Sequence, residues 1–132
     1  MPASILANEH VLAVPDLARS VAFYTQRLGF EVAWSDAPKD FSNGWCAVAR
    51  DDCVVRLGHC PDAAPPAELG DHGYFAYWLV DDASALHDAW SAAGVPMLFP
   101  PRDEPWGRRE FAIRTADGHR IMIGQAIDPP AA

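Results

Sequence analysis

VPDLARSVAFYTQRLGF, residues 14–30, is the segment that decides the fold, because its opening recurs later in the chain. Val14 and Asp16 reappear 66 residues further on as Val80 and Asp82. The same offset of 66 relates VRLG at residues 55–58 to IMIG at residues 121–124. An offset that is unchanged at both ends of a segment predicts two copies of one supersecondary unit.

The length of the chain suits one domain built from these two copies. It has 132 residues, of which 50% are hydrophobic, as in a globular protein. We expect a single domain, residues 1–132, with a first module at residues 5–58, a linker at 59–72 and a second module at 73–125. Modules of about 60 residues are small for independent stability, so they should share a core, within the chain or across a dimer.

The charge of the chain excludes some classes of partner. The net charge is −8, from 18 acidic and 10 basic residues, without a cluster of Lys or Arg. Nucleic acids and anionic membranes are therefore unsuitable partners, whereas small cationic molecules are suitable. No apolar run approaches the ~20 residues that cross a bilayer, and no secretory signal pattern is present, so we expect a cytoplasmic location.

The three cysteines, Cys46, Cys53 and Cys60, are odd in number and have no CxxC spacing. This pattern predicts reduced thiols and neither a disulfide framework nor a zinc knuckle. A metal corner from Cys60 with His59 and His72 is an alternative, although these residues flank a connection rich in Pro and Ala.

The first module reads as β-α-β-β-β. Alternation over residues 5–14 predicts a strand that Pro15 ends. Asp16 is suited to cap a helix whose apolar residues recur at helical spacing until Gly29 stops it. Three more strands are expected, at residues 30–34, 45–49 and 53–57.

The second module repeats this order. A strand at residues 74–80 precedes a helix that starts at Asp82 and stops at Gly94. A strand at 96–99 and a Pro-rich loop at 100–105 follow. The last predicted hairpin covers residues 110–124 and turns at Asp117-Gly118.

Residues 14–30, paired with WGRREFAIRTADGHRIMI at residues 106–123, resemble the vicinal oxygen chelate superfamily, which includes glyoxalase, bleomycin-resistance proteins and dioxygenases. The resemblance implies an α+β fold in which two βαβββ modules form a cup-shaped, mixed eight-stranded sheet around a cavity. It is closest in character to the bleomycin-resistance-like members that bind without a metal. It also implies a homodimer.

The metal-dependent members place ligands at four points, which correspond here to Glu9, Arg56, Phe75 and Met122. Only Glu9 suits a divalent ion, because a guanidinium stays protonated and the other two side chains are poor donors. We therefore expect no metal and no cofactor. His10 lies six residues before Asp16 instead of seven, which turns it to the opposite face as a core or interface histidine unless a β-bulge restores the register.

The register of the hairpins predicts which side chains line the cup. A two-residue turn at Asp51-Asp52 pairs Trp45 with Gly58 and Ala47 with Arg56. Arg56 marks the inner face, so Trp45 points inward as well.

The repeat offset carries these pairs into the second module. It predicts Ile113 opposite Met122 and Phe111 opposite Gly124. Alternation along the two first strands adds their inward residues. The predicted lining, completed by Trp106 near the mouth, is Glu9, Val11, Trp45, Arg56, Phe75, Tyr77, Phe111, Ile113 and Met122.

An aromatic lining with one acid and one guanidinium predicts a small-molecule site, although aromatic residues can also simply fill a barrel. Glu9 and Arg56 are expected on neighbouring strands, where they either pair or leave Arg56 free to clamp a ligand carboxylate or phosphate. Trp106 lies in a loop and is expected over the cavity mouth, at a subunit boundary or in the core.

The main functional hypothesis is a metal-free protein that sequesters a planar, partly apolar ligand, which can be cationic. A second is an enzyme of the same superfamily, a glyoxalase- or dioxygenase-like lyase or oxidoreductase. It would use a metal held by Glu9 or His10 with His72 or His119, or Glu9 as a metal-free general base. A third is a structural or partner-binding domain with a filled cup.

Overall fold

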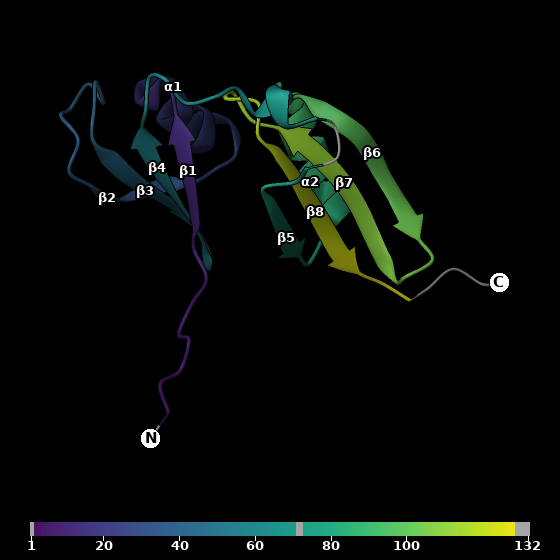
Figure 1. The fold of residues 1–132 in the computed structure, drawn as a ribbon. Coiled ribbons are helices and arrows are strands. Elements are labelled where there is room, and N and C mark those ends of the chain that lie inside the picture. Colours follow the sequence, from purple (N-terminus) through teal and green to yellow (C-terminus); the bar gives the residue numbers. More distant parts are fainter. Residues whose placement is uncertain (1, 71–72, 129–132) are drawn as a thin grey trace. The chain divides into compact units, whose positions relative to one another are not determined.

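The computed structural model describes residues 2–70 and 73–128, and its chain divides into two compact units, residues 1–63 and 64–132 (Figure 1). Each unit contains one βαβββ module, so the predicted α+β class and the two modules are confirmed. The eight strands form two sheets of four, one in each unit.

The first unit holds four strands and one helical segment. The sheet has the order β1-β4-β3-β2, with β1 parallel to β4 and the other pairs antiparallel. The helix starts as predicted, because Asp16 caps it by accepting a hydrogen bond from the Arg19 N–H at 3.0 Å. The elements of the first unit are β1 (His10–Val14), α1 (Leu17–Ala22), the π-helical η1 (Phe23–Arg27), β2 (Glu31–Ser35), β3 (Trp45–Arg50) and β4 (Cys53–His59).

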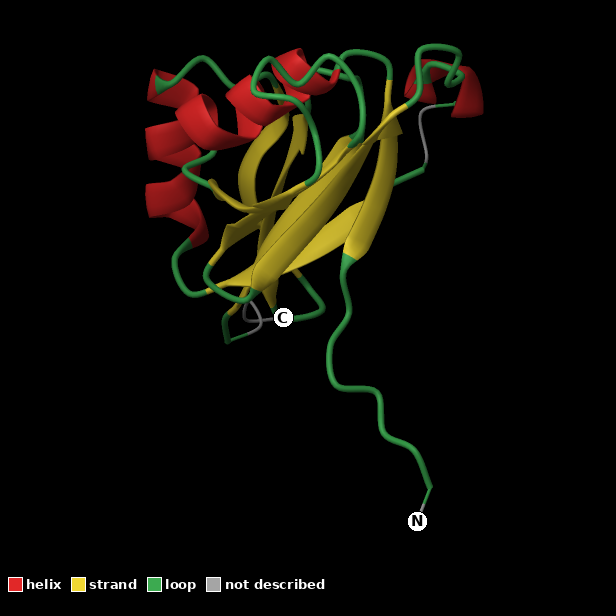
Figure 2. Cartoon of the chain, turned by 90° about the vertical axis from the view of Figure 1, so that its left-hand side faces the viewer, coloured by secondary structure: helices red, strands yellow, loops and turns green. Residues whose placement is uncertain are grey.

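The helical segment packs on one face of this sheet and forms the core of the unit (Figure 2). Leu17, Leu28, Val48, Val55 and Leu57 are all almost fully buried. Each such burial contributes about 1.5–3 kcal/mol. Gly29 then ends the helix with a positive φ of 79°, which glycine adopts without strain.

The second unit has the same order, β5-β8-β7-β6. Asp82 caps its helix by accepting from the Ala85 N–H at 3.0 Å. The core lies between helix and sheet, where the rings of Trp78, Trp90 and Phe111 meet edge-on. The elements of the second unit are η2 (Pro66–Leu69), β5 (Ala76–Val80), α2 (Ala83–Ala92), β6 (Met97–Glu104), β7 (Arg108–Arg114) and β8 (Arg120–Ala126).

Two predicted boundaries are wrong. The first strand begins at His10 and not at Ile5, because β4 starts at Cys53 and its parallel register leaves residues 5–7 without a partner strand. The Pro-rich segment is also not a loop, since β6 continues to Glu104. Proline is tolerated there because β6 is an edge strand whose register shifts between Phe99 and Arg102.

The register of the last hairpin also differs from the prediction. In the first unit the predicted pairs Trp45–Gly58 and Ala47–Arg56 are confirmed. In the second, Gly124 pairs with Glu110 and Met122 pairs with Ala112, one residue away from the expected partners Phe111 and Ile113.

The cause of this slip is the length of the turn. The Thr115 N–H donates to the His119 carbonyl at 2.9 Å, so residues 116–118 form a three-residue connection with Gly118 at φ 94°. The sequence DG had indicated a two-residue turn. One extra residue in the connection exchanges the faces of β7.

In the described part of the chain, none of the helices is long and apolar enough to cross a bilayer.

Candidate functional site

Each sheet has one face packed on its helix and one helix-free face. On the first sheet, strand pairing places the side chains that share a face with Arg56, and they come from all four strands. These residues define the helix-free face of the first sheet: Val11, Ala13, Glu31, Trp34, Trp45, Ala47, Ala49, Val54, Arg56 and Gly58.

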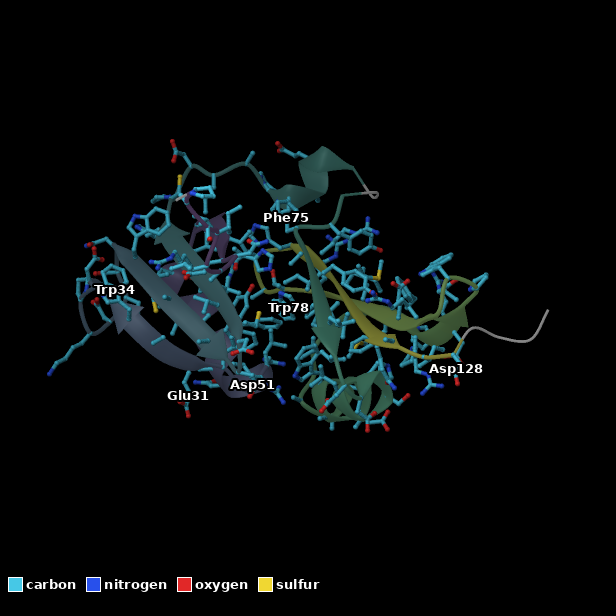
Figure 3. The ribbon with its side chains drawn as sticks, turned by 90° about the horizontal axis from the view of Figure 1, so that it is seen from below. Glu31, Trp34, Asp51, Phe75, Trp78 and Asp128 are labelled. Atoms are coloured by element: carbon cyan, nitrogen blue, oxygen red, sulfur yellow. The ribbon has the colours of Figure 1, made fainter. Side chains whose placement is uncertain are left out.

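Two exposed indoles dominate this face. Trp34, which Figure 3 labels, lies on β2 and is 50% exposed. Trp45 lies on β3 and is 44% exposed. Trp45 lies across Gly58, because a Cβ at that glycine would stand only 2.6 Å from the indole carbons. Because Gly58 has no side chain, the indole ring of Trp45 can rest against the sheet, with its opposite ring face directed away from the sheet.

Glu9 and Arg56 form the predicted ion pair on the same face. Arg56 Nε donates to Glu9 Oε1 at 2.7 Å, and both side chains are partly exposed. An exposed pair of this kind stabilises by at most about 1 kcal/mol. Arg56 is therefore already engaged, and a role of Glu9 as general base would require this pair to break first.

The helix-free face of the second sheet is more polar. Strand pairing places on it the residues that share a side with Met122, among them four arginines and two glutamates. The face consists of Tyr77, Leu79, Phe99, Arg102, Glu104, Arg108, Glu110, Ala112, Arg114, Arg120, Met122, Gly124 and Ala126.

Tyr77 occupies on this sheet the place that Trp45 has on the first. A Cβ at Gly124 would overlap the Tyr77 hydroxyl, so the side chain lies over the glycine. From there the hydroxyl donates to Glu110 Oε2 at 2.6 Å. Burial raises the pKa of Tyr77, and the carboxylate of Glu110 raises it further, whereas Arg108 acts against this shift.

Two predicted lining residues lie on the wrong side of the second sheet. Phe111 and Ile113 are fully buried, and the Phe111 ring contacts Trp90 and His87 of α2. The one-residue slip of β7 explains this, and it brings Glu110 and Ala112 to the helix-free face instead. Glu110 could not be predicted from the sequence for this reason, and neither could Trp34, because the register shift between Val32 and Trp34 interrupts the alternation along residues 30–34.

The other predicted site residues are placed as follows. Val11 is exposed beside Arg56. Phe75 directly precedes β5, where its ring meets His119 edge-on with centroids 4.7 Å apart (Figure 3). Trp106 is 65% exposed in the turn between β6 and β7, so the alternative of core packing is wrong.

The histidines do not gather around one point. His10 pairs with Val55, on the side of the sheet opposite to Arg56, and burial lowers its pKa. His119 is buried beside Thr115, and burial lowers its pKa as well. His72 lies outside the described residues.

The donor chemistry does not fit the metal that the metalloenzymes of this fold hold. Of the four corresponding side chains, Glu9 is paired with Arg56, and neither Phe75 nor Met122 offers a charged donor. Within residues 2–70 and 73–128, no group of three or more His, Cys, Asp or Glu side chains could hold a metal ion.

Comparison with known families identifies the fold. The profile of the Glyoxalase/Bleomycin resistance protein/Dioxygenase superfamily matches residues 7–123. The chain belongs to this superfamily. A search of curated protein sequences gave no match.

Solved structures agree with this assignment. A bleomycin-binding protein from bleomycin-producing Streptomyces verticillus, complexed with copper(II)-bleomycin, is 24% identical with a TM-score of 0.66 and coverage of 96% of this chain and 98% of that one. A bleomycin-binding protein complexed with bleomycin is 23% identical, with a TM-score of 0.71 and coverage of 89% and 96%. A glyoxalase-related enzyme from Clostridium phytofermentans is 18% identical, with a TM-score of 0.74 and coverage of 95% and 98%. At these identities the likeness shows the fold, and the side chains must decide the activity.

Proposed function

We propose that this protein is a small-molecule-binding protein that sequesters a planar, partly apolar ligand without a metal. The observation that carries the proposal is the pair of exposed indoles, Trp34 and Trp45, on the helix-free face of the first sheet. Trp45 is seated over Gly58, so its ring is oriented before a ligand arrives. A preoriented aromatic ring loses little conformational entropy on binding and stacks on flat molecules.

Binding by stacking suits this face better than catalysis. Glu9, the acid beside Arg56, is neutralised by it, so this carboxylate does not stand ready to remove a proton. Two relatives of the same fold are bleomycin-binding proteins by name. The bleomycin in these two structures supports the proposal that a small molecule is sequestered here too.

Titration of tryptophan fluorescence tests this function. We expect saturable quenching by bleomycin or by the planar cation 10-methylacridinium, because both can stack on exposed indoles. Trp34→Ala and Trp45→Ala should each weaken binding by about 1–3 kcal/mol, as the loss of a stacking partner does. Val32→Ala is the matched control, since Val32 lies on the same strand as Trp34 but pairs with Val48 of the buried face, and it should bind normally.

A homodimer is part of the proposal. Ile5 and Leu6 are 94% exposed in the extended segment before β1, and adjacent exposed aliphatic side chains favour contact with another surface. Light scattering during size exclusion should give twice the chain mass of 14.4 kDa. The double variant Ile5→Ser, Leu6→Ser should have a measured mass closer to that of one chain. A wild-type mass equal to that of one chain would contradict the dimer.

A further inference from the structure

The ion pair between Glu9 and Arg56 uses only part of the guanidinium group. Arg56 Nε donates to Glu9 Oε1 at 2.7 Å, and this is the one side-chain hydrogen bond that Arg56 makes to the described residues. Arg109 differs, because it holds Asp103 with two nitrogens, Nε at 2.7 Å and Nη2 at 3.2 Å. Among the described residues, Nη1 and Nη2 of Arg56 therefore have no acceptor.

This end of the guanidinium is open to a ligand. The Arg56 side chain is 46% exposed, so molecules in solution can reach it. Its exposed pairing with Glu9 stabilises by at most about 1 kcal/mol, so the pair does not hold the side chain against a competing ligand. Nη1 and Nη2 form a planar fork whose N–H groups match the two oxygens of a carboxylate.

The two exposed indoles of the first unit lie near this fork. Ala47 pairs with Arg56 on one side and with Trp34 on the other, so these three residues form one row across the first sheet. Neighbouring strands are about 4.8 Å apart, which separates the backbones at Arg56 and Trp34 by about 10 Å. Trp45 is the diagonal neighbour of Arg56, at about 7–8 Å, a separation that long and aromatic side chains bridge.

We propose that the ligand of this site carries a carboxylate on its planar ring system, and that Arg56 binds this carboxylate through Nη1 and Nη2 while Trp34 and Trp45 stack on the ring. A two-ring aromatic acid is long enough to reach from the guanidinium to an indole. This inference rests on the proposed function and adds the charge class of the ligand.

A carboxylate fits this point better than other charged groups. Charge-assisted hydrogen bonds are about twice as strong as neutral ones, and a bidentate pair also fixes the orientation of the ligand. A phosphate monoester carries about −1.5 to −2 charges at pH 7, which one guanidinium already shared with Glu9 neutralises poorly. A cation can stack on the indoles, but it gains no hydrogen bond from Arg56.

The acids of the face leave room for an anionic ligand. Glu9 is neutralised through Arg56 Nε. Glu31 lies opposite Ala49, near the other end of β3 from Trp45. A ligand between Arg56 and Trp45 therefore extends away from the Glu31 carboxylate.

The experiment compares two probes of the same shape, 2-naphthoate and the neutral 2-naphthamide, in calorimetric titrations at pH 8. The wild type should bind the acid about tenfold more tightly, because hydrogen bonds between charged groups are the stronger kind. Arg56→Gln should remove this preference by weakening the acid more than the amide. Lys39→Gln is the matched control, because it also removes one positive charge but lies in the loop between β2 and β3, and it should keep the preference.

Glu9→Gln should raise the affinity for the acid severalfold. Glutamine keeps an oxygen that can accept from Arg56 Nε, but it removes the carboxylate charge that competes with the ligand. A purely structural role of the ion pair would not produce this gain.

Equal affinity of the wild type for the two probes would overturn the inference even if no variant folded. So would an unchanged preference in Arg56→Gln, a loss of the same size in Lys39→Gln, or weaker binding of the acid by Glu9→Gln. A wild type that binds neither probe would instead count against the proposed function itself.

Discussion

At the scale of single residues, two glycines shape the helix-free faces. Gly58 and Gly124 occupy equivalent places in the two modules, and an aromatic side chain lies over each. Both glycines belong to the repeated segment of the sequence, but only the structure shows that Trp45 lies over Gly58 and Tyr77 over Gly124. A glycine inside a strand often marks such a close approach.

Gly58→Ala should displace Trp45. The added Cβ would stand 2.6 Å from the indole, so the ring must move away from the sheet. We expect a loss of about 1–3 kcal/mol in the free energy of unfolding, measured with urea, and a change of tryptophan emission in the folded state. Gly73→Ala meets nothing within 4 Å and should change stability by less than about 0.5 kcal/mol. If Gly58→Ala left the free energy of unfolding unchanged, the Trp45 ring would not lie against this glycine.

The thiols give a second prediction at this scale. Burial raises the pKa of Cys53 to about 11 and that of Cys46 above its ordinary value, while the hydrogen bond to Asp62 raises the pKa of Cys60. Because the thiolate is the reactive form, iodoacetamide at pH 8 should modify the folded protein slowly and the urea-unfolded protein fast. Rapid labelling of Cys53 in the folded Cys46→Ser, Cys60→Ser variant would contradict this placement.

Residue-level prediction from the sequence succeeded where neighbouring strands were read correctly. Glu9 and Arg56 were expected on neighbouring strands, and they form an ion pair because β1 is adjacent to β4, with Val11 opposite Arg56. Glu110 was missed because its face depends on a turn whose length the sequence did not reveal. The identity of the ligand could not be predicted, because it depends on the chemistry of the ligand as well as on these residues.

At the scale of elements, the hairpins show what a pattern can and cannot predict. Asp51-Asp52 forms the expected two-residue turn, and every pair of β3 and β4 follows from it. The turn between β7 and β8 is longer by one residue and is stabilised by His119, whose N–H donates to Thr115 Oγ1 at 3.1 Å. Local side-chain bonds of this kind compete with the two-residue turn and decide the register.

His119 makes the stability of this turn depend on pH. Burial lowers its pKa below the ordinary value of 6.5, so the folded protein binds this proton less readily than the unfolded chain does. The stabilisation by neutral His119 is therefore complete above pH 6.5 and is lost as the pH falls from 6.5 towards the lowered pKa. His10, whose pKa is also lowered by burial, acts in the same direction.

Urea unfolding between pH 7.5 and 5.5 measures this effect. His119→Asn should flatten the dependence of unfolding free energy on pH, while His10 leaves a residual slope. Phe75→Leu removes the ring contact with His119 but keeps the titrating group, so it should lower stability and retain much of the slope. A wild type that becomes more stable over this range as the pH falls would refute the burial of a neutral histidine.

At the scale of the whole molecule, the repeated segment was sufficient for the architecture. Both modules carry the order βαβββ, and both parallel pairs keep the offset of 66 between equivalent residues. Composition and charge could not name the ligand, since many planar molecules satisfy an aromatic face. The superfamily itself includes binding proteins and enzymes by name, so the fold does not choose between them.

The most direct test of the proposed function is to observe the five tryptophan indole N–H signals by nuclear magnetic resonance during titration with 10-methylacridinium. Trp34 and Trp45 lie on the helix-free face of the first sheet, whereas Trp78 and Trp90 are buried in the core of the second unit. We expect saturable shifts of the Trp34 and Trp45 signals with little change at Trp78 and Trp90. Unmoved Trp34 and Trp45 signals at saturating probe would contradict it.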